Sequence, residues 1–399
     1  MYIIKKIIIS ILKLLGYELV SRSEAYDQIV TLKPEMPPKG NVLLAYVLEP
    51  FLSKDPGALT SHTHFGESVQ IAETYLELGY RVDIIDYRNH SFIPRIPYTL
   101  FVSARVNFET IAGKLNEDCI KVVHLDTAHW MFNNSNAYNR YMQLQKRRGV
   151  TIPCNKILEQ TWAIEKSDCA TILGNNFTMD TYAYANKPIH KLPVPTCQTY
   201  NWPASKKFEA CRGSFIWLGS GGVVNKGLDI TLEAFSKLPQ FRLFVCGPIE
   251  EEKVFYNAYY HELNQLPNIK NIGWIDVGSN DFLDITRKCV AVIYPSCSEG
   301  QSGAVITCMQ AGLIPIISYE SGIDVYDFGT ILMECTIDEI QSAVLSISNK
   351  PADDLKQMSK KSWEYANKFH TLQAYKKAYK DVALKILSTR KTPLTIQNS

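Results

Sequence analysis

GSFIWLGSGGVVNKGLDITLEAF, residues 213–235, gives the clearest structural signal in the chain. An apolar run of strand length ends at Gly219, and a helical pattern begins around Leu228. Glycines let a backbone approach a ligand closely, neighbouring N–H groups can point at phosphate oxygens, and a lysine can neutralise their charge. The loop residues expected to meet such a ligand are Ser220, Gly221, Gly222 and Lys226. The lysine is not in a Walker arrangement, because G-x-x-x-x-G-K-[ST] is absent.

A second segment of the same kind, AVIYPSCSEGQSGAVITCMQAGLIPIIS, occupies residues 291–318. We expect a buried strand to end at Pro295 and a helix to end near Gly312, before another strand begins. A carboxylate at the end of a strand can accept hydrogen bonds from sugar hydroxyls, and the free N–H groups of the next helix can bind a diphosphate. The residues at these positions are Glu299, Gly300, Ser302 and Gly303.

Outside these segments, apolar runs of strand length alternate with amphipathic segments, which is typical of βαβ units and parallel sheets. In the first half the expected strands cover residues 41–47, 81–87, 99–104, 121–126 and 170–175. In the second half they cover residues 213–220, 241–247, 289–296 and 313–318. Three prolines interrupt the pattern within 193–207, where we place a linker between two Rossmann-like domains. The chain is therefore predicted to be an α/β protein.

The composition excludes several classes of protein. A chain of 399 residues is too long for one ordinary core, and its 46% hydrophobic and 21% charged residues are typical of soluble globular proteins. Because 42 Lys and Arg face 40 Asp and Glu, no whole-protein field attracts a polyanion, and nucleic acid is not an expected partner. The ten cysteines form no CxxC pair, so we expect reduced thiols in a cytosolic protein.

The first twenty residues, MYIIKKIIISILKLLGYELV, form a separate amphipathic segment. Their apolar positions fall on one helical stripe, with Lys5, Lys6 and Lys13 on or near the other side. The apolar run is too short to span a bilayer, and no small-residue cleavage site follows it. Two interpretations stay open for this helix, which can pack on the protein or a second subunit, or bind an anionic membrane surface.

Together, the two glycine-rich segments resemble the donor half of the GT-B retaining glycosyltransferases called family four, in a subset from bacterial glycan biosynthesis. The resemblance covers nearly the whole chain from about residue 40 and is strongest in 213–320. It implies two Rossmann-like domains facing across a cleft, an acceptor domain over residues 40–195 and a nucleotide-sugar domain over 208–365. A C-terminal helix over 366–392 is expected to cross back and pack on the first domain.

The family pattern has an Arg and, six residues later, a Lys, followed downstream by Glu, seven residues and Glu. In such enzymes the basic pair binds the donor diphosphate, the first Glu contacts the transferred sugar, and the second Glu usually binds the ribose. Lys226 and Glu299 match this pattern. Ser220 replaces the Arg and Thr307 the second Glu, although a threonine hydroxyl can still hydrogen-bond a ribose.

The segment KVVHLDTAHWMFNN and its continuation through RYMQLQKRRGV resemble an AHW…N…R…RRG signature of the bacterial subset. In the wider group a His at the end of this strand reaches the donor sugar or the acceptor. This resemblance makes His129 the first candidate and His124 the second. The alternative for either histidine is a hydrogen-bonded imidazole that holds a loop.

Two further positions are candidates for the acceptor side. His62 and His64 lie in the expected loop TSHTHFGES, where related enzymes carry a pair of glycines near the donor phosphates and only Gly66 is present here. We expect this loop to be a lid or an acceptor contact. Asn175 ends the fifth expected strand, where a polar side chain can meet an acceptor hydroxyl.

The predicted function is metal-independent transfer of a sugar from a nucleotide-sugar donor to a glycan or lipid-linked acceptor with retention, with no cofactor. His129, Lys226 and Glu299 are the candidate catalytic residues, with help from Arg287 or Lys288 if the fold brings either close. The expected location is the cytoplasm or the inner face of the plasma membrane. The alternatives are a nucleotide-sugar epimerase of the same fold and an inactive homologue that binds glycans or partners.

Overall fold

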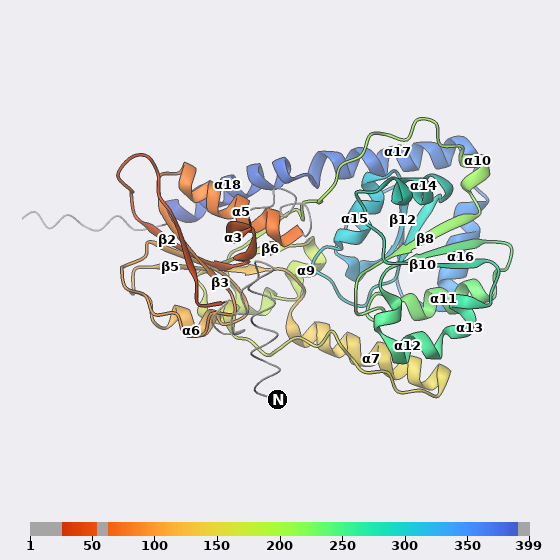
Figure 1. The fold of residues 1–399 in the computed structure, drawn as a ribbon, viewed down its shortest axis with the longest axis horizontal. Coiled ribbons are helices and arrows are strands. Elements are labelled where there is room, and N and C mark those ends of the chain that lie inside the picture. The colour runs from red at the N-terminus through yellow and green to blue at the C-terminus, as the bar shows by residue number, and fades with distance from the viewer. Residues whose placement is uncertain (1–25, 54–62, 390–399) are drawn as a thin grey trace, which may run out of the picture.

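The computed structural model describes residues 26–53 and 63–389, so the amphipathic segment 1–20 and His62 lie outside the described residues. The chain forms two sheets of mainly parallel strands, each flanked by helices (Figure 1). The first sheet contains only residues before the predicted linker and the second only residues after it. The predicted α/β class and its two Rossmann-like domains are confirmed.

The first sheet has the strand order β1-β3-β2-β4-β5-β6-β7. Its strands are β1 (Ile29–Leu32), β2 (Asn41–Tyr46), β3 (Arg81–Asp86), β4 (Leu100–Ala104), β5 (Ile120–Leu125), β6 (Cys169–Leu173) and β7 (Ile189–Leu192). All neighbouring pairs are parallel except β1 with β3. The order of the strands reverses between β2 and β4, which creates a crevice for ligands at the carboxyl ends of these two strands.

The second sheet is entirely parallel, with the order β10-β9-β8-β11-β12-β13. Its strands are β8 (Ser214–Leu218), β9 (Arg242–Cys246), β10 (Ile269–Gly273), β11 (Ala291–Tyr294), β12 (Ile314–Ser318) and β13 (Thr330–Leu332). The order reverses between β8 and β11. The two glycine-rich segments that stood out in the sequence therefore follow the two strands of this switch point.

Helices cover both faces of the first sheet because its central strands are apolar on both sides. On β2, Val42 and Leu44 pack on one face, where α5 (Thr63–Glu77) and α18 (Leu372–Ser388) lie. Leu43 and Ala45 pack on the opposite face. The helices of that second face are α6 (Phe108–Ala112) and α8 (Ala163–Lys166).

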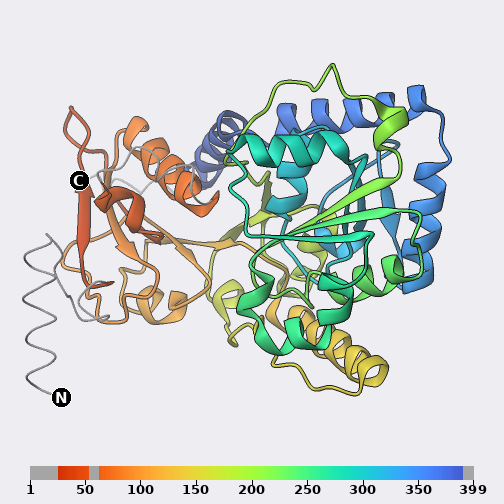
Figure 2. The same ribbon diagram turned by 45° about the vertical axis from the view of Figure 1, so that its right-hand side comes forward.

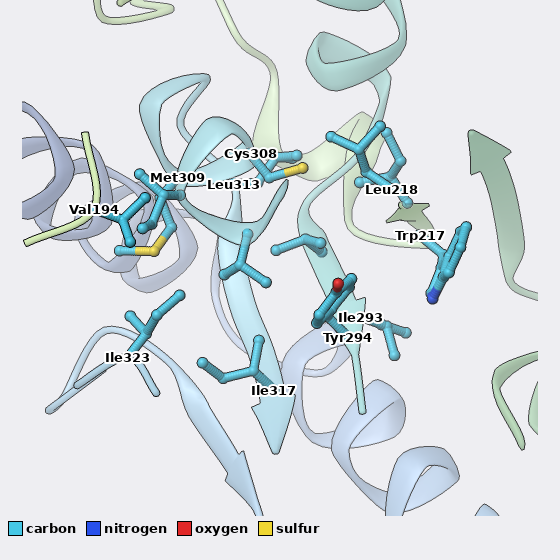
Figure 3. Close-up of a cluster of buried hydrophobic side chains, with 14 of the residues drawn as sticks. Val194, Trp217, Leu218, Ile293, Tyr294, Cys308, Met309, Leu313, Ile317 and Ile323 are labelled. Atoms are coloured by element: carbon cyan, nitrogen blue, oxygen red, sulfur yellow. The ribbon is translucent and has the colours of Figure 1, made fainter. Parts of the chain in front are cut away.

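The second sheet is covered in the same way. One group of helices contains α10 (Phe208–Cys211), α14 (Asn280–Lys288), α15 (Gly303–Gln310) and α17 (Ala352–Phe369). The other contains α11 (Leu228–Ser236), α12 (Lys253–Ala258), α13 (Tyr260–Asn264) and α16 (Ile337–Ser348). Figure 3 shows part of this apolar core, with Trp217 of β8, Ile293 of β11, Ile317 of β12 and Met309 of α15 among its side chains.

The C-terminal segment consists of two helices, and the one that corresponds to the expected helix over 366–392 is α18, which begins at Leu372. The chain turns at His370 and Thr371, because the Thr371 side chain accepts a hydrogen bond from the Ala374 amide (3.1 Å) and begins α18 as its N-cap. His370 is also tied to the linker, since its carbonyl accepts from the Thr196 amide (2.9 Å). Figure 1 shows α17 along the second domain and α18 along the first.

A second helix joins the domains. α7 (Trp130–Arg148) follows β5 of the first sheet but extends beneath the second domain (Figure 2). Arg147 binds Asp229 (2.6 Å) and Glu233 (3.0 Å) of α11. Arg148 pairs with Glu233 and Glu262. The signature expected on the acceptor side thus places two of its arginines against the second domain.

Removing the Arg147 guanidinium is expected to destabilise the protein, because Asp229 is fully buried and would keep only Arg140, at 3.8 Å. Breaking a buried ion pair from one side costs about 3–5 kcal/mol. We predict that Arg147→Ala lowers the free energy of unfolding by this amount, measured by urea denaturation, whereas the exposed Arg95→Ala changes it little. The double variant Arg147→Ala/Asp229→Asn should regain much of the loss. Equal stability of Arg147→Ala and the wild type would contradict this role.

Candidate functional site

The loops after β8 and β11 are bonded to each other, which brings the two glycine-rich segments into one site. The Cys297 amide donates to the Asn225 carbonyl at 2.8 Å. Gly227 has a φ of +71°, and a Cβ there would lie 2.4 Å from the Pro295 carbonyl oxygen, so only glycine allows this approach. The site lies at the switch point, where doubly wound sheets bind their ligands.

Lys226 is partly buried in this site, with its ammonium 3.4 Å from the Ser220 hydroxyl. Burial lowers the pKa of Lys226, and the nearby Glu299 carboxylate opposes that effect. The structure thus brings together Lys226, Glu299 and Ser220, the serine at the expected Arg position. Arg287 instead pairs with Asp284 on its own helix at 2.8 Å, and Lys288 is exposed.

Glu299 is oriented by two hydroxyl groups and by the first domain. One of its carboxylate oxygens accepts hydrogen bonds from the Tyr294 hydroxyl (2.9 Å) and the Ser296 hydroxyl (3.2 Å). Its carbonyl accepts from the amide of Ala128, at 3.3 Å. A carboxylate held in this way can accept hydrogen bonds from a sugar through its other oxygen.

The expected phosphate cradle differs from the observed loop. The amides of Gly222 and Val223 both donate to one oxygen of Glu252, with 3.1 Å for the Val223 bond. These two amides are therefore already engaged. A Cβ at Gly221 would lie 3.7 Å from the same oxygen of Glu252. Glu252 follows β9 and was not a sequence candidate. The turn therefore offers a diphosphate no free amide at Gly222 or Val223.

The N-terminus of α15 supplies other free amides, because its N-cap, Ser302, makes no side-chain capping hydrogen bond. The position of a Cβ on Gly303 would lie 3.8 Å from the Thr63 hydroxyl at the start of α5, so this helix end faces the first domain. Thr307 lies one turn further along and donates its hydroxyl to the Gly303 carbonyl at 2.9 Å. Its oxygen still has the capacity to accept from a ribose hydroxyl.

Gly300 is the point where the backbones of the two domains meet. A Cβ at Gly300 would lie 2.3 Å from the Asp126 carbonyl oxygen and 2.7 Å from that of Leu173. The Thr178 hydroxyl donates to the Gly300 carbonyl at 2.8 Å. Nearby, the Asn175 side chain donates to Asp324 of the second domain at 2.9 Å, so Asn175 serves as a contact between domains.

A polar cluster occupies the corresponding end of the first sheet. The Tyr46 hydroxyl and the His64 ring each lie 2.8 Å from one oxygen of the buried Glu67. Burial disfavours the charged imidazole, but the Glu67 carboxylate outweighs burial and raises the pKa of His64 to about 9. Burial by itself would raise the pKa of Glu67, but the charge of His64 holds this pKa well below its usual range. His64 is therefore a cation at neutral pH.

From Thr63 onward, this arrangement corrects the predicted loop at 60–68. His64 and Gly66 lie on the first turns of α5, which begins at Thr63, because the short polar segment before the apolar pattern is already helical. His124, at the end of β5, is also part of the cluster. Its Nδ1 lies 2.8 Å from the Thr171 hydroxyl, and its Nε2 lies 3.9 Å from Glu67.

Asp126 joins this cluster to Gly300. Its carboxylate lies 3.3 Å from the Arg105 guanidinium, at the carboxyl end of β4. Burial would raise the pKa of Asp126, but Arg105 and His64 lower it. Neither Arg105 nor Asp126 was a sequence candidate. The only signal that could have indicated them is their position directly after strands β4 and β5, because doubly wound sheets bind ligands at the carboxyl ends of their strands.

His129 is the N-cap of α7. Its Nδ1 accepts from the Met131 amide at 3.3 Å, and its Nε2 lies 3.0 Å from the Tyr184 hydroxyl. Burial lowers the pKa of His129. Both ring nitrogens are thus engaged within the first domain, and no contact in the described part of the chain joins His129 to Lys226 or Glu299. His129 thus holds this loop, and its catalytic role stays a prediction.

Within 26–53 and 63–389, no group of three or more His, Cys, Asp and Glu side chains is arranged to hold a metal ion. No helix in these ranges combines the length and the apolar character that crossing a membrane requires.

Residues 212–349 match the family model described as Glycosyl transferases group 1. Comparison with the curated proteins gives no match. Sucrose-phosphate synthase from Thermosynechococcus elongatus is a similar solved structure, with a TM-score of 0.58, 13% identity, and coverage of 88% of this chain and 100% of that one. HepE from Anabaena, solved with UDP and glucose, has a TM-score of 0.55, 10% identity, and coverage of 88% and 100%.

A TarM mutant from S. aureus has a TM-score of 0.51 and 12% identity, and the match covers 72% of this chain. The chain spans about half of TarM, 55% of its length. At these identities the likeness concerns the fold, and the predicted GT-B fold is confirmed. The second domain in addition carries the sequence pattern of the glycosyl transferases group 1 family.

The raised pKa of His64 predicts a pH-dependent stability. Because this pKa lies above the usual value of 6.5, the interaction with Glu67 is fully present below about pH 6.5 and is lost as the pH rises through about 9. We expect the urea midpoint of the wild type to fall between pH 6.5 and pH 9. His64→Gln should be less stable at pH 6.5 and should lose this part of the pH dependence. A parallel decline in both proteins would show that His64 is not the titrating group.

Proposed function

We propose that this protein is a retaining glycosyltransferase that moves a hexosyl group from a nucleoside diphosphate sugar to a glycan or lipid-linked acceptor. The observation that carries the proposal is the meeting of Lys226 and Glu299 at the switch point of the second sheet. These residues lie within the segment that matches the glycosyl transferases group 1 model. Since HepE was solved with UDP and glucose, a UDP-sugar is the first donor to test.

In this proposal the nucleotide lies against the second domain. Lys226 and the free amides of α15 stabilise the diphosphate, and Thr307 meets the ribose. Charge that develops on the departing phosphate is thereby met by preorganised donors, which is commonly a large part of enzymatic rate enhancement. Glu299 accepts hydrogen bonds from the transferred sugar through the carboxylate oxygen that faces away from Tyr294 and Ser296.

The acceptor approaches from the first domain, where His64 lies on the first turn of α5 and Arg105 and Asp126 follow strands β4 and β5. Retention follows from a displacement on one face of the sugar. The bond between the anomeric carbon and the phosphate oxygen breaks, the acceptor oxygen bonds to the same carbon, and its proton passes to the departing phosphate. Positioning and charge stabilisation supply the catalysis in this scheme. We propose that no metal or cofactor takes part, and EDTA should then leave turnover unchanged.

A donor panel separates this proposal from its alternatives. A nucleotide-sugar epimerase would convert the donor without an acceptor and release no nucleoside diphosphate. An inactive homologue would bind a donor or glycan without slow hydrolysis or transfer. Incubating the protein with UDP-glucose, UDP-N-acetylglucosamine and other nucleotide sugars, and measuring free nucleoside diphosphate, distinguishes the three. Release of nucleoside diphosphate with retained anomeric configuration supports the transferase.

Glu299→Gln tests the assignment of the sugar contact. The variant keeps an oxygen for Tyr294 and Ser296 but loses the negative charge, so transfer should fall by about 10²–10³ in kcat. UDP affinity, measured by calorimetry, should change less than about twofold. The exposed Glu251→Gln is the matched control and should retain turnover. An equal loss of UDP affinity and of turnover would assign Glu299 to the nucleotide instead.

We further propose that residues 1–20 bind an anionic membrane surface on the cytoplasmic side, beside a lipid-linked acceptor of envelope-glycan assembly. Each of Lys5, Lys6 and Lys13 would contribute about 1 kcal/mol at most near such a surface, and salt would weaken this share. Deleting residues 1–20 should abolish sedimentation with phosphatidylglycerol vesicles and leave donor hydrolysis intact. If the deletion unfolds the protein or changes its subunit number, and the intact protein ignores the vesicles, the segment is structural.

A further inference from the structure

We propose that Lys156, from the first domain, is the second cation of the donor diphosphate site and takes over the role of the arginine that Ser220 replaces. This inference rests on the proposed function, because it assigns a residue to the same site. Lys156 lies in the segment between α7 and α8, which carries no recognisable motif, and it is more than sixty positions from the loop it serves.

The geometry of Gly222 places Lys156 on the donor loop. Gly222 has a φ of +81°, and a Cβ there would lie 2.4 Å from Cγ of Lys156 and 3.0 Å from its Cε. The aliphatic part of Lys156 therefore passes directly over the Gly222 backbone. Any side chain at 222 would both strain the backbone and displace the lysine.

The segment that carries Lys156 is fixed by asparagines of α7. Asn133 donates to the Lys156 carbonyl at 3.0 Å. Asn134 donates to the Leu158 carbonyl and accepts from the Leu158 amide, at 2.9 Å each. The Asn residues of the AHW…N segment thus hold the backbone of a basic residue against the other domain.

The charges of the site require such a residue. Lys226 shares the site with two carboxylates, Glu299 and Glu252, and both interact with its charge. Without another cation the site would carry one negative charge before the diphosphate arrives. Lys156 brings this sum to zero, and its own charge adds to the effect of burial in lowering the pKa of Lys226. The two lysines therefore repel each other, and a diphosphate between them would relieve that repulsion.

Other basic residues of this region are already committed. Arg140 donates to the Pro295 carbonyl at 3.1 Å, and Arg147 and Arg148 pair with carboxylates of the second domain. The exposed ammonium of Lys156 has no hydrogen-bonding partner within residues 26–53 and 63–389. It is therefore free to bind a phosphate oxygen by turning about its side-chain bonds.

Calorimetric binding of UDP, uridine and inorganic pyrophosphate tests the proposal. Lys156→Ala should weaken UDP and pyrophosphate binding about 10- to 100-fold, the effect of one charge-assisted hydrogen bond, and leave uridine binding unchanged. Lys226→Ala should have a similar effect. Lys156→Arg should retain most of the affinity, and Lys33→Ala, at an exposed lysine of the first domain, should retain all of it. Ser220→Arg in the Lys156→Ala background should restore binding, because it returns a cation to the same place.

Thermal unfolding of each variant gives the control for folding, and Lys156→Ala should unfold at the wild-type temperature. If Lys226→Ala weakens UDP binding but Lys156→Ala behaves like Lys33→Ala, the proposal for Lys156 is overturned and the proposed function stands. If the wild type binds neither UDP nor pyrophosphate, the diphosphate site itself is wrong, and the role of Lys156 falls with it.

Discussion

The close approach of backbones at Gly300 constrains everything else in the site. No side chain fits between Gly300 and the carbonyl groups of Asp126 and Leu173, so the loop after β11 and the ends of β5 and β6 meet without any spacer. Glu299 immediately precedes Gly300, and Asp126 supplies one of the two carbonyl groups that Gly300 approaches. The relative position of the two polar clusters is thus set by main-chain atoms, which have less conformational freedom than side chains.

The polar and ionic contacts of α7 also fix the position of the second domain relative to the first, at points further from Gly300. Arg140 and Asn136 bind carbonyl groups of the loop after β11, while Arg147 and Arg148 bind carboxylates on α11 and α13. A helix that belongs to the first domain by sequence therefore holds the second domain. It also fixes the segment that carries Lys156, so structural support and the inferred ligand contact come from one element.

Interior strands could be predicted from the sequence, whereas the strands at the sheet edges could not. Every expected strand corresponds to an observed one, and the four that were missed, β1, β7, β10 and β13, are the four edges of the two sheets. Interior strands are buried on both faces and read as continuous apolar runs, but β1 and β10 alternate with exposed residues. Lys226 and Glu299 were identifiable because they lie beside glycines in a local pattern. Glu252 and Lys156 reach the site only through tertiary contacts, which leave no local signal, and the only sign of Asp126 in the sequence is its place at the end of an expected strand.

The two crossings between the domains lie next to each other. The linker is bonded to the turn between α17 and α18 at two places. The Thr196 amide donates to the His370 carbonyl, and Nδ1 of His370 lies at hydrogen-bond distance from the Val194 carbonyl, each at 2.9 Å. A rotation that separates the domains would use this paired crossing as its axis. Because α7 lies along the opposite side of the molecule (Figure 1), its ion pairs would lengthen most in such a rotation. Separating the domains in this way would break the ion pairs of α7 with Asp229 and Glu262, whose buried carboxylates are little screened by salt.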